Sequence, residues 1–308
     1  MNILQMVQYI YFLIIFLIIG LNYLHIKRQF YVSVNVEEIT YIDYELTKYQ
    51  YHELCYDKIP FVYKYGVSDD EKQFERDLLI NKFKNYDVHI SDQKVELQQY
   101  FSDVSNASNS SSVKFTQSFY NQEFLKETAL FEKLYSKDSF LRPSFTCFYD
   151  YDILLSNNNK ALSNEAEQHI FQNKFYGHFI HCIDESLTIK LISPKFHSYF
   201  EENDNLDNLN SDSNVFSNKI QKNIPLFNDE IMKNHKNYCK ITVQNVVLQP
   251  GDLLYIPSLW FYSYKPDSEY NVSISYNYMT YMNYVLFLQK IYNNVVSNLH
   301  NSVQKLLK

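Results

Sequence analysis

The chain has 308 residues, of which 46% are hydrophobic and 20% are charged, and its formal net charge is −7 at pH 7. This length suffices for one sizeable hydrophobic core with an appendage. Four glycines in the whole chain exclude the glycine-rich loops that bind phosphate or dinucleotides. The negative charge argues against nucleic acid as a partner.

The aromatic and cysteine contents narrow the fold class further. The 29 tyrosines and 23 phenylalanines favour a β-rich core, because these side chains are common in strands and bury large areas. The four cysteines stand far apart and show no spacing typical of zinc sites. We therefore expect separate, reduced and mostly buried thiols.

An apolar stretch near the start of the chain predicts a membrane anchor. Residues 3–24 would span about 30 Å as a helix. Residues 1–8, before the most apolar run at 9–21, have no basic side chain, and no small-residue cleavage site follows, so the stretch does not resemble a cleaved signal peptide. Lys27 and Arg28 come next, which places the following domain in the cytosol. The sequence therefore predicts a single-pass anchor at 1–28. Because the domain would lie in the cytosol, its Asn-x-Ser glycosylation motifs should stay unmodified.

Beyond the anchor, the apolar spacing predicts alternating strands and helices. Strands are expected at 32–36, 59–67, 86–90 and 144–155, with two more at 175–194 joined by a turn at 184–186. Helices are expected at 37–54, 70–85 and 121–136. Polar segments at 102–112 and 201–224 read as loops. Several further strands are expected between 238 and 281.

Two C-terminal segments show clear periodicity. In 271–279 apolar residues alternate with serine and asparagine, which predicts a half-buried antiparallel strand. From 281 to 307 the period changes to three or four residues and predicts an amphipathic helix. We expect this helix to pack on the barrel, or to bind a protein partner or a second copy in a homodimer. Its apolar residues are Val285, Leu288, Tyr292, Val295, Leu299, Val303 and Leu306.

The run "LQPGDLLYIPSLWFYSY" at 248–264 carries a family resemblance. Together with "KIPFVYKYGV" at 58–67 and "LTIKLISP" at 187–194, it resembles the cupin-like Jumonji-C family over residues 32–280. The narrower resemblance is to membrane-anchored cupin-like proteins of large DNA viruses. The resemblance implies a mainly β fold with flanking helices, a double-stranded β-helix or jelly roll, in a domain at 29–280. Active members are Fe(II)- and 2-oxoglutarate-dependent hydroxylases or demethylases.

The metal ligands that the resemblance implies are missing. The family binds iron through His-x-Asp or His-x-Glu and a later histidine, because alternate strand residues point into the barrel together. No His-x-Asp or His-x-Glu occurs in the chain. The family's spacing places Gln172 and Lys174 at the first two ligand positions and Tyr262 at the third. Glutamine is a poor iron ligand and an ammonium repels a cation, so this site is degenerate.

Other side chains could in principle replace the missing ligands. His178 and His181 are three residues apart in an expected strand, so they should face opposite sides and cannot chelate one ion. His169 or His178 together with Tyr262 would give a rescued metal site, as a variant enzyme would need. Trp260, Tyr264, His178 and Lys190 are expected to line the barrel.

The sequence thus predicts a pseudoenzyme: a membrane-anchored cupin-like protein with no cofactor and a binding or structural role, in a virus-derived membrane. One alternative is an Fe(II)/2-oxoglutarate-dependent hydroxylase with a variant metal site. Another is a metal-free cupin that binds a small ligand.

Overall fold

The structure is a computed structural model that describes most of the chain, with gaps. The described residues are 3–29, 39–90, 93–106, 121–157, 170–196, 219–220, 226–227, 232 and 239–281. The expected strand at 32–36, His169 and the expected helix at 281–307 (apart from Tyr281) lie outside them.

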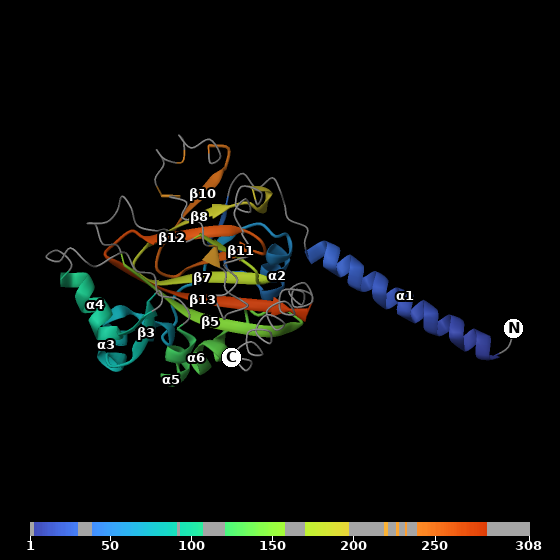
Figure 1. The fold of residues 1–308 in the computed structure, drawn as a ribbon, viewed down its shortest axis with the longest axis horizontal. Coiled ribbons are helices and arrows are strands. Elements are labelled where there is room, and N and C mark those ends of the chain that lie inside the picture. The colour runs from blue at the N-terminus through green and yellow to red at the C-terminus, as the bar shows by residue number, and fades with distance from the viewer. Residues whose placement is uncertain are drawn as a thin grey trace, which may run out of the picture.

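Two sheets face each other in the centre of the domain (Figure 1). Their neighbours are antiparallel, except for the parallel pair β1–β2. From β5 onward the chain passes repeatedly between the sheets, as in a jelly roll. The six-stranded sheet has the order β1 (Thr40–Ile42), β2 (Phe61–Lys64), β11 (Asp252–Pro257), β7 (Gly177–Asp184), β13 (Tyr270–Thr280), β5 (Thr146–Asn157). The five-stranded sheet has the order β10 (Val243–Leu248), β8 (Leu187–Ile192), β12 (Phe261–Pro266), β6 (Ile170–Gln172), β9 (Lys219–Ile220).

Short helices and a two-stranded sheet cover the outer face of the six-stranded sheet. One hydrophobic cluster joins Tyr51, Phe74 and Phe124 from these elements to Tyr151 and Tyr276 of the sheet. The covering elements are α2 (Lys48–Tyr56), η1 (Glu71–Phe74), α3 (Arg76–Phe83), β3 (Asp87–Ile90), β4 (Gln93–Glu96), α4 (Leu97–Asn106), α5 (Gln122–Glu127) and α6 (Leu130–Lys137). A last short helix, η3 (Pro194–Phe196), follows β8.

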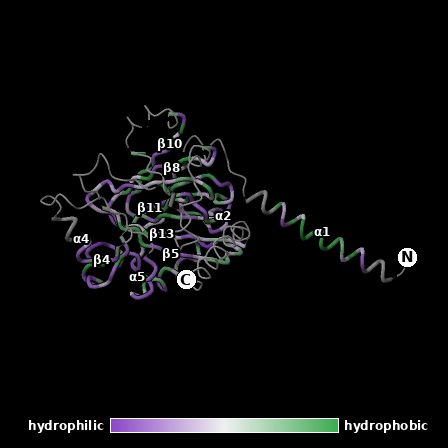
Figure 2. The backbone as a smooth tube through the Cα atoms, in the orientation of Figure 1, coloured by the Kyte–Doolittle hydropathy of each residue, from purple (hydrophilic) through white to green (hydrophobic). Residues whose placement is uncertain are grey.

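The first helix, α1 (Ile3–Gln29), projects away from the domain (Figure 1). Its described large apolar side chains are exposed, for example Phe12 at 71% and Phe16 at 78%. Figure 2 shows hydrophobic stretches along it. In the part of the chain that is described, no helix has both the length and the apolar character needed to cross a membrane.

Strand β13 is buried on both faces, so the expectation of a half-buried strand is wrong. Its apolar residues, such as Ile274 and Tyr276, join the cluster under the covering helices. Its polar residues Ser273, Ser275 and Asn277 point the other way, into the space between the sheets, and are at most 5% exposed. The alternation therefore marks a polar inner face of the barrel instead of a solvent-exposed one.

Most expected elements are present, with shifted boundaries. The expected helix at 37–54 begins only at Lys48, because Thr47 accepts a hydrogen bond from the Gln50 amide and caps it. Residues before it form β1 instead. The expected helix at 121–136 is split into α5 and α6, since Ala129 adopts a left-handed conformation with φ of 57°.

The turn between β10 and β11 explains why a glycine stands at position 251. Gly251 has φ of +94°, and its carbonyl accepts hydrogen bonds from the amides of Tyr65 and Gly66. A Cβ atom there would lie 3.3 Å from the Cα of Gly66. Asp252 closes the turn by accepting a hydrogen bond from the Gln249 amide at 2.9 Å.

We expect Gly251→Ala to lower the free energy of unfolding by about 1–3 kcal/mol, because alanine is strained at this φ and crowds the facing backbone. Gly66→Ala is the matched control: its φ is +78°, but no atom lies within 4 Å of the added Cβ. Chemical denaturation of both variants measures the difference. Equal losses would show that the close approach to Gly66 contributes nothing.

The thiols differ in part from expectation. All four cysteines are free, as predicted, but only Cys55 and Cys182 are buried, whereas Cys147 and Cys239 are exposed.

The asparagine of one glycosylation motif, Asn271, is 1% exposed and donates hydrogen bonds to the carbonyls of Asp184 and Glu185. Modification of this side chain is incompatible with the fold.

Candidate functional site

Polar side chains form a row across three neighbouring strands at one end of the barrel. Asn277 of β13 pairs with His178 of β7 on one side and with Asp150 of β5 on the other. Directly opposed residues of antiparallel strands point to the same face. Because Asn277 points between the sheets, His178 and Asp150 share that face. We call these three residues the inner polar row.

An aromatic stack from the opposite sheet lies against this row. Tyr262 of β12 is opposite Phe171 of β6, with ring centroids 5.3 Å apart and an interplanar angle of 25°. The Tyr262 ring also lies beside the His178 ring, at 4.9 Å between centroids and 33°. All three side chains are at most 5% exposed. The stack therefore joins the two sheets at the position where the sequence resemblance places a metal ligand.

The first expected ligand position, Gln172, does not join this stack. The register sets Gln172 opposite Phe261, which packs on the outer face of the five-stranded sheet. Phe171, one residue earlier, is the side chain that meets Tyr262 inside the barrel. Lys174 follows the end of β6 and is half-buried. The structure therefore does not bring Gln172, Lys174 and Tyr262 together as one cluster.

The residues expected to line the barrel divide between its two faces. Trp260 and Tyr264 belong to the core between the sheets, and the Tyr264 ring stacks on Phe171 at 5.8 Å. His178 also points inward. Lys190 differs from the expectation: it pairs with Ser263, and its Nζ donates to the Leu226 carbonyl at 2.8 Å on the outer face. Strand parity places Lys190 outside, since Ile189 and Leu191 fill the interior.

His178 is held as a neutral imidazole. Burial lowers its pKa to about 4, although the hydrogen bond with Asn277 acts in the opposite direction. His178 Nδ1 contacts Asn277 Oδ1, and Asn277 Nδ2 donates to Ser275 Oγ at 3.2 Å. Asn277 Oδ1 therefore faces His178 Nδ1, and Ser275 Oγ lies 3.5 Å from the same nitrogen. His181 lies on the opposite face, 3.2 Å from Glu71, as the spacing predicted.

Residues suited to hold iron are lacking in the described part of the barrel. No three His, Cys, Asp or Glu side chains gather there as metal ligands would. The stack offers one imidazole, a phenol and a phenyl ring, where Fe(II) in this family needs two imidazoles and a carboxylate. The Asp150 carboxyl is engaged with Gln122 Nε2 at the edge of the sheet. These residues do not fit the iron that the resemblance implies.

Sequence reasoning missed Asp150, Ser275 and Asn277 of this site. The alternating polar positions of β13 indicate these residues, but the sequence alone predicts that they face solvent.

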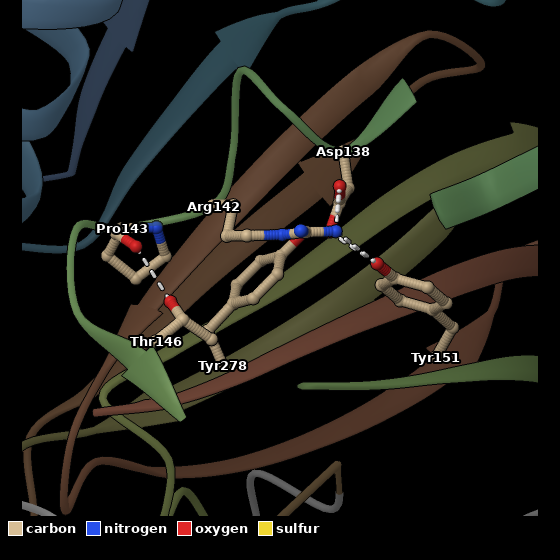
Figure 3. A network of polar contacts seen from close by, with 6 residues as sticks. All are labelled: Asp138, Arg142, Pro143, Thr146, Tyr151 and Tyr278. Atoms are coloured by element: carbon tan, nitrogen blue, oxygen red, sulfur yellow. Dashed lines mark hydrogen bonds and ion pairs between the residues drawn. The ribbon is translucent and has the colours of Figure 1, made fainter. Parts of the chain in front are cut away.

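Sequence reasoning also missed a buried hydrogen-bond network on the outer face of the same sheet (Figure 3). There Asp138, 1% exposed, accepts hydrogen bonds from Arg142, Tyr151 and Tyr278.

Burial raises the pKa of Asp150 to about 7, against hydrogen bonds and the nearby charge of Lys126 that lower it. A folded pKa above the unfolded value of 3.8 means that the folded state binds more protons between pH 4 and 7. Asp150 therefore costs stability as the pH rises through this window, and the cost is constant above about pH 7.

We expect Asp150→Asn to raise the free energy of unfolding by about 1–3 kcal/mol at pH 8. This is less than the full pKa shift of Asp150 would give, because the side chain keeps some contact with solvent. The gain should shrink to nothing near pH 4. Denaturation curves across this range measure it. A gain that is independent of pH would show that Asp150 is ionised throughout.

Strands that alternate between two facing sheets define a double-stranded β-helix protein. The sequence matches the family of the cupin-like domain over residues 76–284, more than half of the chain. The chain belongs to this cupin-like family. β1 and β2 precede the matched region but extend the same sheet. The search of curated proteins finds no relative that matches the chain.

Proposed function

We propose that this is a membrane-anchored cupin-like protein, a pseudo-oxygenase with a non-catalytic binding or structural role. The observation that carries the proposal is the stack of Phe171, Tyr262 and His178. Closely packed rings stabilise the join between the sheets by roughly 0.5–1.5 kcal/mol per pair beyond the area that they bury. The same packing leaves the third ligand position with a ring face instead of an imidazole nitrogen.

The donor set supports the absence of iron-dependent chemistry. His178 is neutral and could ligate through one nitrogen, but the Asp150 carboxyl on the same face is engaged with Gln122 Nε2, and burial raises its pKa to about 7. A divalent ion held by one neutral ligand would lose most of its hydration without compensation. The competing function, a hydroxylase with a variant site, needs ligands that this face of the barrel does not supply.

The anchor we propose is α1, and this part of the proposal rests on the sequence, because no helix of the described residues is both long and apolar enough to cross a membrane. Its described side chains are those of residues 8–24, and the sequence extends this apolar stretch through Ile3, Leu4, Met6 and Val7. At 1.5 Å per residue, the 27-residue helix is about 40 Å long, enough for a hydrocarbon core of about 30 Å. Lys27 and Arg28 favour a domain in the cytosol.

The membrane that we propose is a virus-derived one, because the sequence resembles viral cupin-like proteins. A homodimer or protein partner held through 281–307 is part of the same proposal.

Turnover of 2-oxoglutarate to succinate tests the non-catalytic role. Purified protein with Fe(II), ascorbate and 2-oxoglutarate should release no succinate above a reaction without protein. Tyr262→Phe should not change this, and should cost only about 0.5–1.5 kcal/mol of stability for one hydrogen bond. Succinate release by the wild type that Tyr262→Phe abolishes would establish the variant hydroxylase instead.

A further inference from the structure

Aromatic side chains gather at an exposed corner of the domain where β5 begins. Phe145, directly before β5, is 82% exposed, and Tyr135 of α6 is 44% exposed. The Tyr135 ring lies 5.2 Å from the Tyr149 ring of β5, and the Arg142 guanidinium lies over these two rings at 4.3 and 5.0 Å. We call Tyr135, Phe145 and Tyr149 the aromatic corner. None of the described strands extends the sheet beyond β5, so this corner lies at the edge of the sheet.

The backbone holds Phe145 in this exposed position. Its φ of 64° is a left-handed conformation that bulky residues rarely adopt. Thr146 Oγ1 donates to the Pro143 carbonyl at 2.7 Å and fixes the turn around Phe145 (Figure 3). Strained residues of this kind cost stability and gather at functional sites. A strained aromatic residue that is left exposed indicates a surface that makes a contact.

The C-terminal segment of the chain emerges beside this corner. Thr280, the last residue of β13, pairs with Thr146, so the antiparallel register sets Tyr281 opposite Phe145. Tyr281 is the last described residue, and it is helical and 65% exposed. The segment that follows therefore begins next to Phe145.

Tyr281 is also in phase with the apolar stripe that the sequence predicts for this segment. At 3.6 residues per turn, the stripe residues of the first three turns share one side of the predicted helix: Tyr281, Val285, Leu288 and Tyr292. Lys290 falls on the opposite side, where its ammonium stays in water. These turns can therefore bury apolar side chains against the domain and keep their charge solvated.

The direct connection to β13 determines which partner reaches the corner. No residue separates the end of β13 from the helical Tyr281, so the segment is tethered beside the corner at a high effective concentration. A separate chain would have to displace it. The stripe continues from Val295 to Leu306, so half of it remains for another surface.

We propose that residues 282–292 continue the helix from Tyr281 and pack their apolar stripe on the aromatic corner of the same chain. This inference rests on the proposed role of 281–307 and divides that segment in two. Its first half makes an intramolecular contact, and the half from Val295 to Leu306 is left to hold the homodimer or protein partner. Phe145 is the first ring that the contact covers, because it lies opposite Tyr281.

Alkylation of Cys147 reports the contact, because this exposed thiol lies between Phe145 and Tyr149 in the chain. Leu288→Asp places a charge in the stripe and releases the segment. In the detergent-solubilised full chain it should speed the alkylation of Cys147 at least about tenfold. Asn283→Asp is the matched control: it adds the same charge on the opposite side of the predicted helix and should leave the rate unchanged. Cys239, which is also exposed, is the internal reference.

Phe145→Asn tests the surface that receives the segment. Asparagine tolerates a positive φ, so the substitution removes the ring and keeps the turn. It should speed the alkylation of Cys147 about as much as Leu288→Asp does. The double variant should react no faster than either single variant, because both substitutions break one contact. Phe145 is exposed, so this variant remains informative even if Leu288→Asp does not fold.

Unchanged alkylation of Cys147 in Leu288→Asp or in Phe145→Asn would overturn the inference. So would a wild-type rate that falls as the protein concentration rises, because a second copy would then cover the corner; the rate we expect is independent of concentration. Iron content and succinate release are measured separately. Failure of this contact therefore leaves the non-catalytic role standing, whereas iron uptake would refute that role and leave the contact.

Discussion

Asp138→Ala is expected to lower the free energy of unfolding by about 3–5 kcal/mol, because the hydrogen-bond donors around the buried Asp138 carboxylate lose their acceptor. Arg142 donates to both carboxylate oxygens, through Nη2 at 2.5 Å and Nε at 2.9 Å. Tyr278 donates at 3.2 Å, and Tyr151 also donates to the same oxygen. The network ties the segment before β5 to two strands of the six-stranded sheet (Figure 3).

Tyr278→Phe is the matched control for this network. It removes one hydroxyl and one hydrogen bond but keeps the ring and the Arg142–Asp138 ion pair, so a loss of about 0.5–1.5 kcal/mol is expected. Urea denaturation followed by circular dichroism measures both variants. If Asp138→Ala cost no more than Tyr278→Phe, the carboxylate would not be the centre of the network.

On the proposed anchor, Leu13→Arg combined with Leu17→Arg is expected to release the protein from membranes. Both side chains are exposed on α1, at 66% and 54%, and one turn apart they lie on the same side of the helix. Each arginine near the centre of a spanning helix costs roughly 2.5–3.5 kcal/mol of insertion free energy. Flotation of vesicles that contain the expressed protein measures the bound fraction.

The control for the anchor keeps both positions apolar. Leu13→Ile with Leu17→Ile should float like the wild type. Protease treatment of sealed vesicles then reports topology, and a cytosolic domain should be digested without detergent when the cytosolic face is outward. If the two arginines left the floated fraction of the protein unchanged, α1 would not be what holds the protein in the bilayer.

Much of the architecture could be predicted, because the pattern of the strands is a local property. The alternation in 271–279, the two strands within 175–194 and the turn at Gly251 all follow from side-chain period and turn chemistry. What could not be predicted is which face of β13 points inward, since both faces are covered. That depends on helices that pack from elsewhere in the chain.

The candidate site was only partly predictable for a similar reason. Tyr262 and His178 were identified from the motif and from residue type. Placing Gln172 required a register, and a shift of one residue turns a strand side chain to the other face. Phe171 therefore occupies the interior that was expected for Gln172. Lys190 differs by the same parity, since its position opposite Ser263 sends it outward.

Iron content after anaerobic reconstitution tests most directly whether the stack of Phe171, Tyr262 and His178 has replaced the metal site. The full chain is incubated with excess Fe(II), freed of unbound metal by gel filtration, and analysed for iron per chain by mass spectrometry. The stack predicts iron at the level of a protein without a metal site, both for wild type and for Tyr262→Phe. One iron per wild-type chain, lost in Tyr262→Phe or His178→Leu, would contradict it and identify a working metal centre.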